Sequence, residues 1–369
     1  MHDLVHDLAR LVMLDEILVT SEQVSTAGIS YRYALLGNCT QPLETSSDYL
    51  AKIRALRFMN CRTIDLNDVP FSPAKSLRVL DLSECSIEKL PDFIGLFKQL
   101  MYLNAPGVQH QSITNSITKL IKLMYLSLRG SSEILLLPES VGEMKGLMYL
   151  DLSDCSGIQQ LPESFGNLEE LVHLNFSNCS CIQSLSQCLR SLTELQYLNL
   201  SCNSDLYLPA DVEHIGNLTK LEYLNLSCRS NLYLPLPNLD FLGTLTKLKY
   251  LNLSSQQSNP KWLPEDLGNL MELKYLNLSG CHMIEQLPAS FGRLKSLVYL
   301  DLSCCSLLLG IPQALRGLTN LEYLNLSMPN EQEYCGDRLH LAGLPEVIGS
   351  LIKLRELNLV RCMDYIFGK

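Results

Sequence analysis

Cysteines are the residues of this 369-residue chain whose types could most readily do chemistry, and there are fourteen of them. Thiolates bind zinc, act as nucleophiles and pair into disulfides. The spacing does not favour zinc. One residue separates Cys179 from Cys181, Cys304 and Cys305 are adjacent, and no second pair follows at the spacing of a zinc finger. We therefore predict no metal site.

Half of the cysteines recur at one place in a repeated phrase, which indicates packing and not reactivity. A small apolar thiol can fill a tight inner turn and still donate a weak hydrogen bond. We expect these side chains to be reduced and to lie in the core. They are Cys61, Cys85, Cys155, Cys179, Cys281, Cys305 and Cys362.

Other reactive patterns are missing from the sequence. It has no nucleophile elbow, no His-Glu-x-x-His zinc motif and no phosphate-cradling glycine loop, so we predict that the chain is not an enzyme. Asn-x-Ser sequons recur at one strand position in six repeats, but glycans on successive strands about 5 Å apart would collide. We interpret them as by-products of the repeat. The asparagines are Asn175, Asn199, Asn225, Asn252, Asn277 and Asn325.

Composition narrows the possible partners and compartments. A formal charge of −10 argues against a general nucleic-acid binder, and no apolar run is long enough to span a membrane. Asp3 and Asp7 stand where a secretory signal would carry positive charge. With so many thiols and no export signal, a reducing compartment is expected. We predict a cytoplasmic or nucleocytoplasmic protein that binds neither nucleic acid nor metal.

The phrase that carries the cysteines is a repeat of the form Leu-x-x-Leu-x-Leu, as in residues 297–302. Its first positions are mostly 23 to 27 residues apart, except for a step of 33 after Leu321. This is the spelling and spacing of leucine-rich repeats. Thirteen repeats begin at Ile53, Leu77, Leu100, Leu123, Leu147, Leu171, Leu195, Leu221, Leu248, Leu273, Leu297, Leu321 and Leu354.

One repeat predicts its own structure. Residues 148–153 alternate, which is typical of a short strand that buries Leu150 and Leu152 and exposes Tyr149, Asp151 and Ser153. Ile158, Leu161, Phe165 and Leu168 then return to the core from the outer side, where Pro162 is tolerated. The predicted fold is an α/β repeat solenoid, a leucine-rich-repeat horseshoe. A parallel β-sheet forms its concave face, and short helices or turns form its convex face.

The outward strand positions form rows of tyrosine, asparagine or aspartate, and serine, which are residues that binding surfaces favour. The concave face is therefore a candidate protein-binding surface. Even rows equally suit a scaffold, because stacked rings and polar ladders stabilise a sheet, so both interpretations stay open. The better candidates are the polar loop 328–338 and the residues that break the pattern, namely Arg129, His173, Lys249 and Lys274. The candidate residues are Arg129, Tyr149, His173, Tyr197, Tyr223, Lys249, Tyr250, Lys274, Tyr275, Tyr299 and Tyr323.

The chain before the repeats has a different pattern. Apolar residues near 3.6-residue spacing predict a helix over 1–20. Residues 21–50 show no repeat and are expected to be a transition or N-terminal capping segment, since the end of a solenoid must be covered. Residues 51–369 form the predicted repeat domain.

Two stretches carry a resemblance to one family. The outer phrase of residues 161–168, joined to Leu-x-Tyr-Leu-Asp-Leu-Ser, resembles the repeats of plant intracellular nucleotide-binding leucine-rich-repeat immune receptors. Met1, His2 and Asp3 resemble the Met-His-Asp motif that ends the nucleotide-binding module of that family shortly before its repeats. By that resemblance, residues 1–20 are a remnant of the module and His2 would touch the phosphates of ADP. The chain lacks the other nucleotide motifs, so ADP or ATP is expected only with an upstream module.

The resemblance implies a recognition module in plant defence. Its partners would be proteins: a pathogen effector, a guarded host protein, or the receptor's own nucleotide-binding module in an autoinhibitory contact. Two alternatives remain open, namely a stand-alone intracellular signalling scaffold of the Ras-group-related type and a non-functional truncated product.

Overall fold

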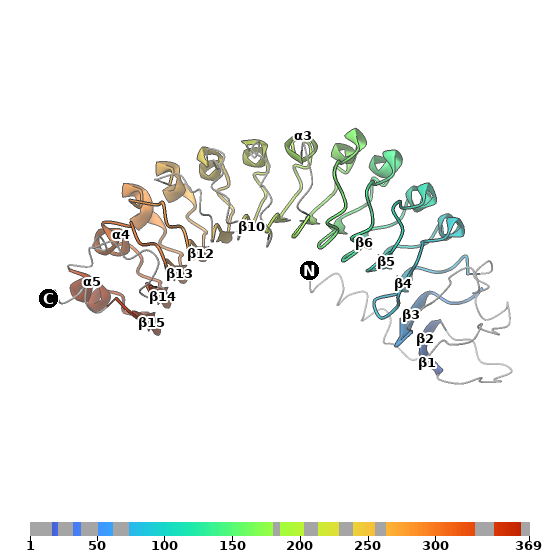
Figure 1. Ribbon diagram of the computed structural model, residues 1–369, viewed down its shortest axis with the longest axis horizontal. Coiled ribbons are helices and arrows are strands. Elements are labelled where there is room, and N and C mark those ends of the chain that lie inside the picture. Colours follow the sequence, from blue (N-terminus) through green and yellow to red (C-terminus); the bar gives the residue numbers. More distant parts are fainter. Residues whose placement is uncertain are drawn as a thin grey trace. The chain divides into compact units, whose positions relative to one another are not determined.

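A computed structural model describes residues 17–20, 32–37, 51–61, 74–179, 185–202, 213–228, 239–254, 263–328 and 343–362. The chain divides into two compact units, residues 1–171 and residues 172–369. Each unit is built in the same way, with short parallel strands on one side and short helices on the other (Figure 1).

Parallel strands in register form the sheet of each unit. In unit 1, every strand pairs with the next along the chain, and Leu103, Leu126 and Leu150 stand opposite one another on successive strands. The strands of this unit are β1 (Ile17–Thr20), β2 (Tyr33–Gly37), β3 (Ala55–Met59), β4 (Val79–Asp81), β5 (Tyr102–Asn104), β6 (Tyr125–Ser127) and β7 (Tyr149–Asp151).

Unit 2 repeats this pairing from β8 to β15, so its leucines also stand in one row across the sheet. Its strands are β8 (His173–Asn175), β9 (Tyr197–Asn199), β10 (Tyr223–Asn225), β11 (Tyr250–Asn252), β12 (Tyr275–Asn277), β13 (Tyr299–Asp301), β14 (Tyr323–Asn325) and β15 (Glu356–Asn358).

The core lies between the strands and the helices, as the alternation of apolar and polar residues in each strand predicted. Leu150 and Leu152 are buried, as predicted, and so are Phe165 and Leu168 on the helix side. Leu161 is half-buried at the turn between the two sides. Each repeat thus contributes leucines from both directions to a continuous apolar interior, which is how a solenoid is stabilised without one large core. The predicted α/β leucine-rich-repeat solenoid is confirmed.

In the repeats that begin at residues 77 to 321, the outer phrase folds into one short helix, usually of the 3-10 type. Prolines occupy the position before five of these helices, where the missing amide donor costs nothing. The helices are η2 (Asp92–Leu96), η3 (Asn115–Lys119), η4 (Glu139–Glu143), η5 (Glu163–Asn167), α3 (Leu185–Leu189), η6 (Glu213–Asn217), η7 (Asp240–Thr244), η8 (Glu265–Asn269), η9 (Ala289–Arg293), α4 (Ile311–Leu315) and α5 (Leu344–Ser350).

Glycines in these helices let neighbouring repeats approach closely. A Cβ atom on Gly142 would lie 2.0 Å from the carbonyl oxygen of Ser164 in the next repeat, and one on Gly317 would overlap the backbone of Gly292. Gly349 in α5 has no such neighbour within 4 Å. The outer glycine is therefore required by packing in some repeats and not in others.

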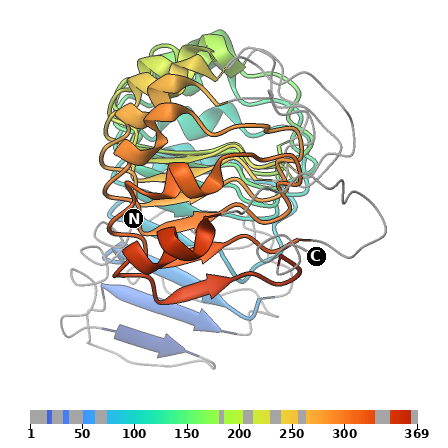
Figure 2. The same cartoon turned by 90° about the vertical axis from the view of Figure 1, so that its left-hand side faces the viewer.

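The expected helix over residues 1–20 is contradicted at residues 17–20, and residues 1–16 lie outside the described residues. Residues Ile17–Thr20 form strand β1, which pairs in parallel with β2, and β2 pairs with β3. Figure 2 shows these strands side by side in blue. Apolar spacing misled the prediction because isoleucine, valine and threonine also suit a strand beside an existing sheet. The sheet therefore begins upstream of residue 51.

Candidate functional site

The tyrosines at the first outward position of each strand stack upon one another. In unit 1 the ring centroids of Tyr102, Tyr125 and Tyr149 are 4.2 Å apart with nearly parallel planes. In unit 2 a longer stack has centroid spacings from 3.8 to 4.3 Å. We call this surface the tyrosine face. Its unit 2 members are His173, Tyr197, Tyr223, Tyr250, Tyr275, Tyr299 and Tyr323.

Stacking decides which atoms of the tyrosine face a partner could contact. Each inner ring has both faces covered by its neighbours, and the side chains are half-buried, so ring edges and hydroxyl groups are what remains. Burial raises the pKa of Tyr223 to about 12 and also raises the pKa of Tyr102, Tyr250 and Tyr299. The hydroxyls therefore stay protonated near neutral pH and can both donate and accept hydrogen bonds.

The asparagine and aspartate side chains of the second outward row form hydrogen bonds to the backbone of their own repeat. The side-chain oxygen of Asn277 accepts a hydrogen bond from the backbone amide of Ser279 at 2.8 Å, and Asp301 makes the same bond to Ser303 at 2.8 Å. Such bonds turn the chain at the end of a strand. They recur at Asp81, Asp151, Asn175, Asn199, Asn225, Asn252, Asn325 and Asn358.

Several residues of the second and third outward rows were predicted to be exposed, and for these the prediction is wrong. Asp151 and Ser153 are buried, and so are Asp301, Asn325 and Ser127. Around Asp301, the hydroxyl of Tyr299 donates to the carboxylate at 3.4 Å and the amide of Asn325 donates to it at 3.2 Å. The asparagines of the sequons thus have their carbonyl oxygens engaged, which agrees with their interpretation as part of the repeat.

His173 is buried instead of facing solvent, contrary to the prediction for an outward position. Its ring stacks on Tyr197 at 3.8 Å. Burial disfavours the charged imidazolium and lowers the pKa of His173 to about 3. It acts as a neutral aromatic member of the stack.

Two of the three charged candidates are engaged with neighbouring carboxylates. Arg129 lies 3.4 Å from the carboxylate of Asp154 near the carboxyl ends of the unit 1 strands. Lys249 lies 2.9 Å from Glu222 at the opposite ends of the unit 2 strands, and that hydrogen bond raises the pKa of the lysine. Lys274 is exposed on the next rung. The backbone amide of Lys274 donates to the carbonyl oxygen of Lys249 at 2.9 Å, so these two candidates lie on neighbouring connectors of unit 2.

The cysteines of the repeat position are buried in the core, as predicted, except for the half-buried Cys85 and Cys179. The Cys155 thiol donates to the carbonyl oxygen of Leu128 at 3.2 Å, and Cys305 donates to that of Leu278 at 3.1 Å. Burial raises the pKa of the Cys305 thiol well above its ordinary value. These thiols therefore fill the inner turns and tie each repeat to the one before it.

Within the described ranges, no group of three or more histidine, cysteine, aspartate or glutamate side chains is placed so that it could hold a metal ion.

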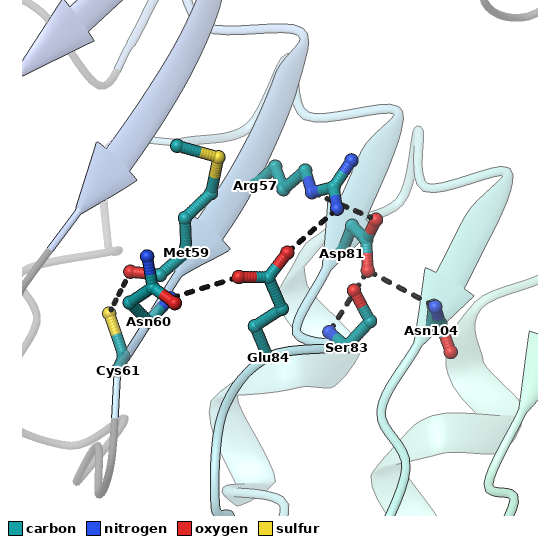
Figure 3. Close-up of polar contacts among 8 residues, drawn as sticks. All are labelled: Arg57, Met59, Asn60, Cys61, Asp81, Ser83, Glu84 and Asn104. Carbon is teal, nitrogen blue, oxygen red and sulfur yellow. Dashed lines mark hydrogen bonds and ion pairs between the residues drawn. The ribbon is translucent and has the colours of Figure 1, made fainter.

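One polar cluster was missed by the sequence analysis. Arg57 occupies the asparagine position on β3 and reaches both Glu84, at 3.0 Å, and Asp81, at 3.7 Å (Figure 3). Asp81 also accepts a hydrogen bond from Asn104, so the cluster crosses three strands. An arginine breaking the asparagine row was the available signal. The cluster links β3 and β4, which carry no member of the tyrosine stack, to β5, where the stack begins.

Several predicted features lie outside the described residues. These are Met1, His2 and Asp3 of the proposed motif, and residues 329–338 of the polar loop. Within the described residues, no helix is long and apolar enough to cross a membrane.

Short parallel strands, a leucine-lined interior and one short helix per turn define a leucine-rich-repeat solenoid, a class of protein-interaction module. Comparison with known families agrees. A family model described as a leucine-rich repeat region matches residues 106–234 and 233–365, and a leucine-rich-repeat model matches residues 76–97. The chain belongs to the leucine-rich-repeat family.

Solved structures show the same fold at low sequence identity. A leucine-rich-repeat protein of Leptospira interrogans is 21% identical, with a TM-score of 0.54, 88% of this chain covered and 89% of that one. An internalin of Listeria monocytogenes is 19% identical, with a TM-score of 0.55 and coverages of 85% and 88%. TLR13 in complex with ssRNA13 is 21% identical, with a TM-score of 0.59, 85% of this chain covered and 49% of that one. Comparison with curated proteins found no match.

Proposed function

We propose that this chain is the protein-recognition module of a plant intracellular immune receptor and that it binds partners through the tyrosine face. The observation that carries the proposal is the unit 2 stack, in which half-buried rings over consecutive strands present edges and hydroxyls. Tyrosine provides rigid, amphipathic contact area with little conformational entropy to lose on binding. The partner would be a pathogen effector, a guarded host protein, or the nucleotide-binding module of the same receptor.

The proposal names a plant receptor because the outer phrase of residues 161–168 and the motif at Met1–Asp3 resemble that family. In this view the protein works in the cytoplasm, as part of a defence response. ADP or ATP would be held by an upstream module, and the chain would need no cofactor of its own.

A binding screen tests the proposal. The immobilised 369-residue chain is presented with candidate effectors, candidate guarded proteins and a separately produced nucleotide-binding module. A partner should be lost when Tyr250 and Tyr275 are both changed to Ala. Met271→Ala is the matched control, because Met271 is exposed outside the tyrosine face. Retention of every partner by the double tyrosine variant would show that this face is not the recognition surface.

A second candidate function is a stand-alone scaffold of the Ras-group-related type. It is favoured by the evenness of the rows, since the asparagines bond within their own repeats and the rings cover one another. A transcript that continues upstream into a complete nucleotide-binding region would rule against it.

A further inference from the structure

The connectors that lead into the strands of unit 1 concentrate positive charge. They are residues 51–54, 74–78, 97–101, 119–124 and 144–148, and they contain no aspartate or glutamate. We call this surface the basic edge. Its cations are Lys52, Arg54, Lys75, Arg78, Lys98, Lys119, Lys122 and Lys145.

Backbone hydrogen bonds place these connectors side by side. The amide of Arg78 donates to the carbonyl oxygen of Arg54 at 2.7 Å, and Met101 donates to Arg78 at 2.8 Å. The same bond links Met124 to Met101 and Met148 to Met124, each at 2.9 Å. Neighbouring strands are about 4.8 Å apart, so the cations form one stripe over five rungs.

The charge of this stripe is largely uncompensated. All its cations are exposed except Arg54, which is half-buried. Among the described residues, Lys98 donates to the backbone oxygen of Lys119 and Lys122 to the side-chain oxygen of Gln99, and both acceptors are neutral. Within the described part of the chain, only Lys145 comes near a carboxylate, at 4.0 Å from Glu169. Like charges held together in this way raise the free energy of the unbound surface.

The same edge of unit 2 is built differently. There three of the cations meet acids on the preceding repeat: Lys220 pairs with Glu194, Lys249 with Glu222 at 2.9 Å, and Arg355 with Glu322 at 3.3 Å. The corresponding connectors of unit 2 thus carry acids that pair with some of their cations, whereas the connectors of unit 1 carry no acid. The requirements of the repeat therefore do not explain the basic edge.

The neighbouring side chains indicate which anion fits. Met101, Met124 and Met148 are half-buried beside the cations, and Ile121 is 66% exposed among them. Methionine adapts readily to apolar side chains of a partner. Unpaired bases would need open aromatic faces, but the adjacent Tyr125 ring is covered on both sides. We propose that the basic edge binds a carboxylate-rich segment of a partner protein that also carries apolar side chains.

This surface is separate from the tyrosine face, so the inference does not depend on the proposed function. Fluorescence anisotropy with the full chain tests it. The probes are a labelled oligoglutamate peptide with interspersed leucines, an oligolysine peptide and a single-stranded oligouridylate RNA. Titrations are run at low salt and at about 0.15 M salt, where exposed charges are screened beyond about 8 Å.

Two matched triple variants locate the binding. K75E/K98E/K122E reverses three cations of the basic edge, and K247E/K274E/K295E reverses three exposed lysines on the corresponding connectors of unit 2. Both change the net charge equally. We expect the first to raise the Kd for the glutamate peptide at least about tenfold and the second less than about twofold, since three ion pairs are lost only in the first.

The neutral variant K75Q/K98Q/K122Q should raise the Kd for the glutamate peptide by an intermediate factor. Circular dichroism of both variants shows whether a loss of binding is due to misfolding. The proposal is overturned if the wild-type chain does not bind the glutamate peptide at low salt, or if both reversed triples lose binding equally. Tighter binding of the RNA, lost in K75E/K98E/K122E, would assign the edge to nucleic acid instead.

Discussion

Truncating Leu300 and its neighbour Tyr299 in separate variants tests how each strand divides between core and surface. Leu300 lies on β13 between Leu276 and Leu324, and all three are fully buried. Replacing it with alanine leaves a cavity that the flanking rungs cannot close without disturbing their own pairing. We expect Leu300→Ala to lower the free energy of unfolding by about 2–5 kcal/mol.

Tyr299 should cost less to truncate, but not as little as a solvated side chain. Its ring stacks on Tyr275 at 4.2 Å and on Tyr323 at 4.3 Å. Each aromatic pair contributes about 0.5–1.5 kcal/mol, so Tyr299→Ala should cost about 1–3 kcal/mol. Tyr299→Phe keeps both stacks and loses only hydroxyl contacts, which are worth about 1 kcal/mol or less.

Equilibrium urea unfolding followed by circular dichroism measures all three variants. The expected order of destabilisation is Leu300→Ala, then Tyr299→Ala, then Tyr299→Phe. A Tyr299→Ala variant as destabilised as Leu300→Ala would refute the assignment of inward and outward positions. If Tyr299→Ala cost no more than Tyr299→Phe, the stack would contribute nothing to stability.

Three further predictions follow from individual contacts. Gly142→Ala should destabilise the protein by about 1–3 kcal/mol, because the added methyl group overlaps the next repeat; Gly349→Ala, with open space around it, should be nearly neutral, and similar melting temperatures would contradict the packing argument. Asn277→Ala should cost about 0.5–1.5 kcal/mol through the lost bond to Ser279, whereas Asn277→Asp keeps the acceptor and should cost less, as urea midpoints will show. The raised pKa of Tyr223, about 12, means that the folded chain keeps protons that the unfolded chain loses above pH of about 10; stability should therefore fall from about pH 10 to about pH 12, and a melting temperature unchanged over that window would contradict the burial of the hydroxyl.

Much of the fold was predictable because the residue pattern of each repeat determines its own local structure. Leucines two residues apart can point to one side only in a strand, and thirteen copies of the phrase can be buried only by stacking. The outer proline likewise indicated which part of the repeat lies outside the sheet. The prediction was wrong at Ile17–Thr20, because a segment without the repeat phrase obtains its conformation from pairing with a neighbouring strand.

The candidate site was less predictable. Tyrosine, asparagine and serine were expected to share one outward surface. Only the spacing between rungs determines that tyrosine rings cover each other, that Asp151 is buried and that His173 is neutral. The basic edge was also missed, since its cations are about 23 residues apart in sequence and become neighbours only through the stacking of repeats.

The sequence alone determines that this chain is a leucine-rich-repeat solenoid, because the period of apolar residues dictates both the strand and its partners. The tertiary structure decides which outward residues are available for binding. Exposure depends on what lies one rung away, and that neighbour is distant in the chain. The pairing of Lys249 with Glu222 in unit 2, and the lack of a carboxylate near Lys98 among the described residues of unit 1, are set by rung-to-rung proximity.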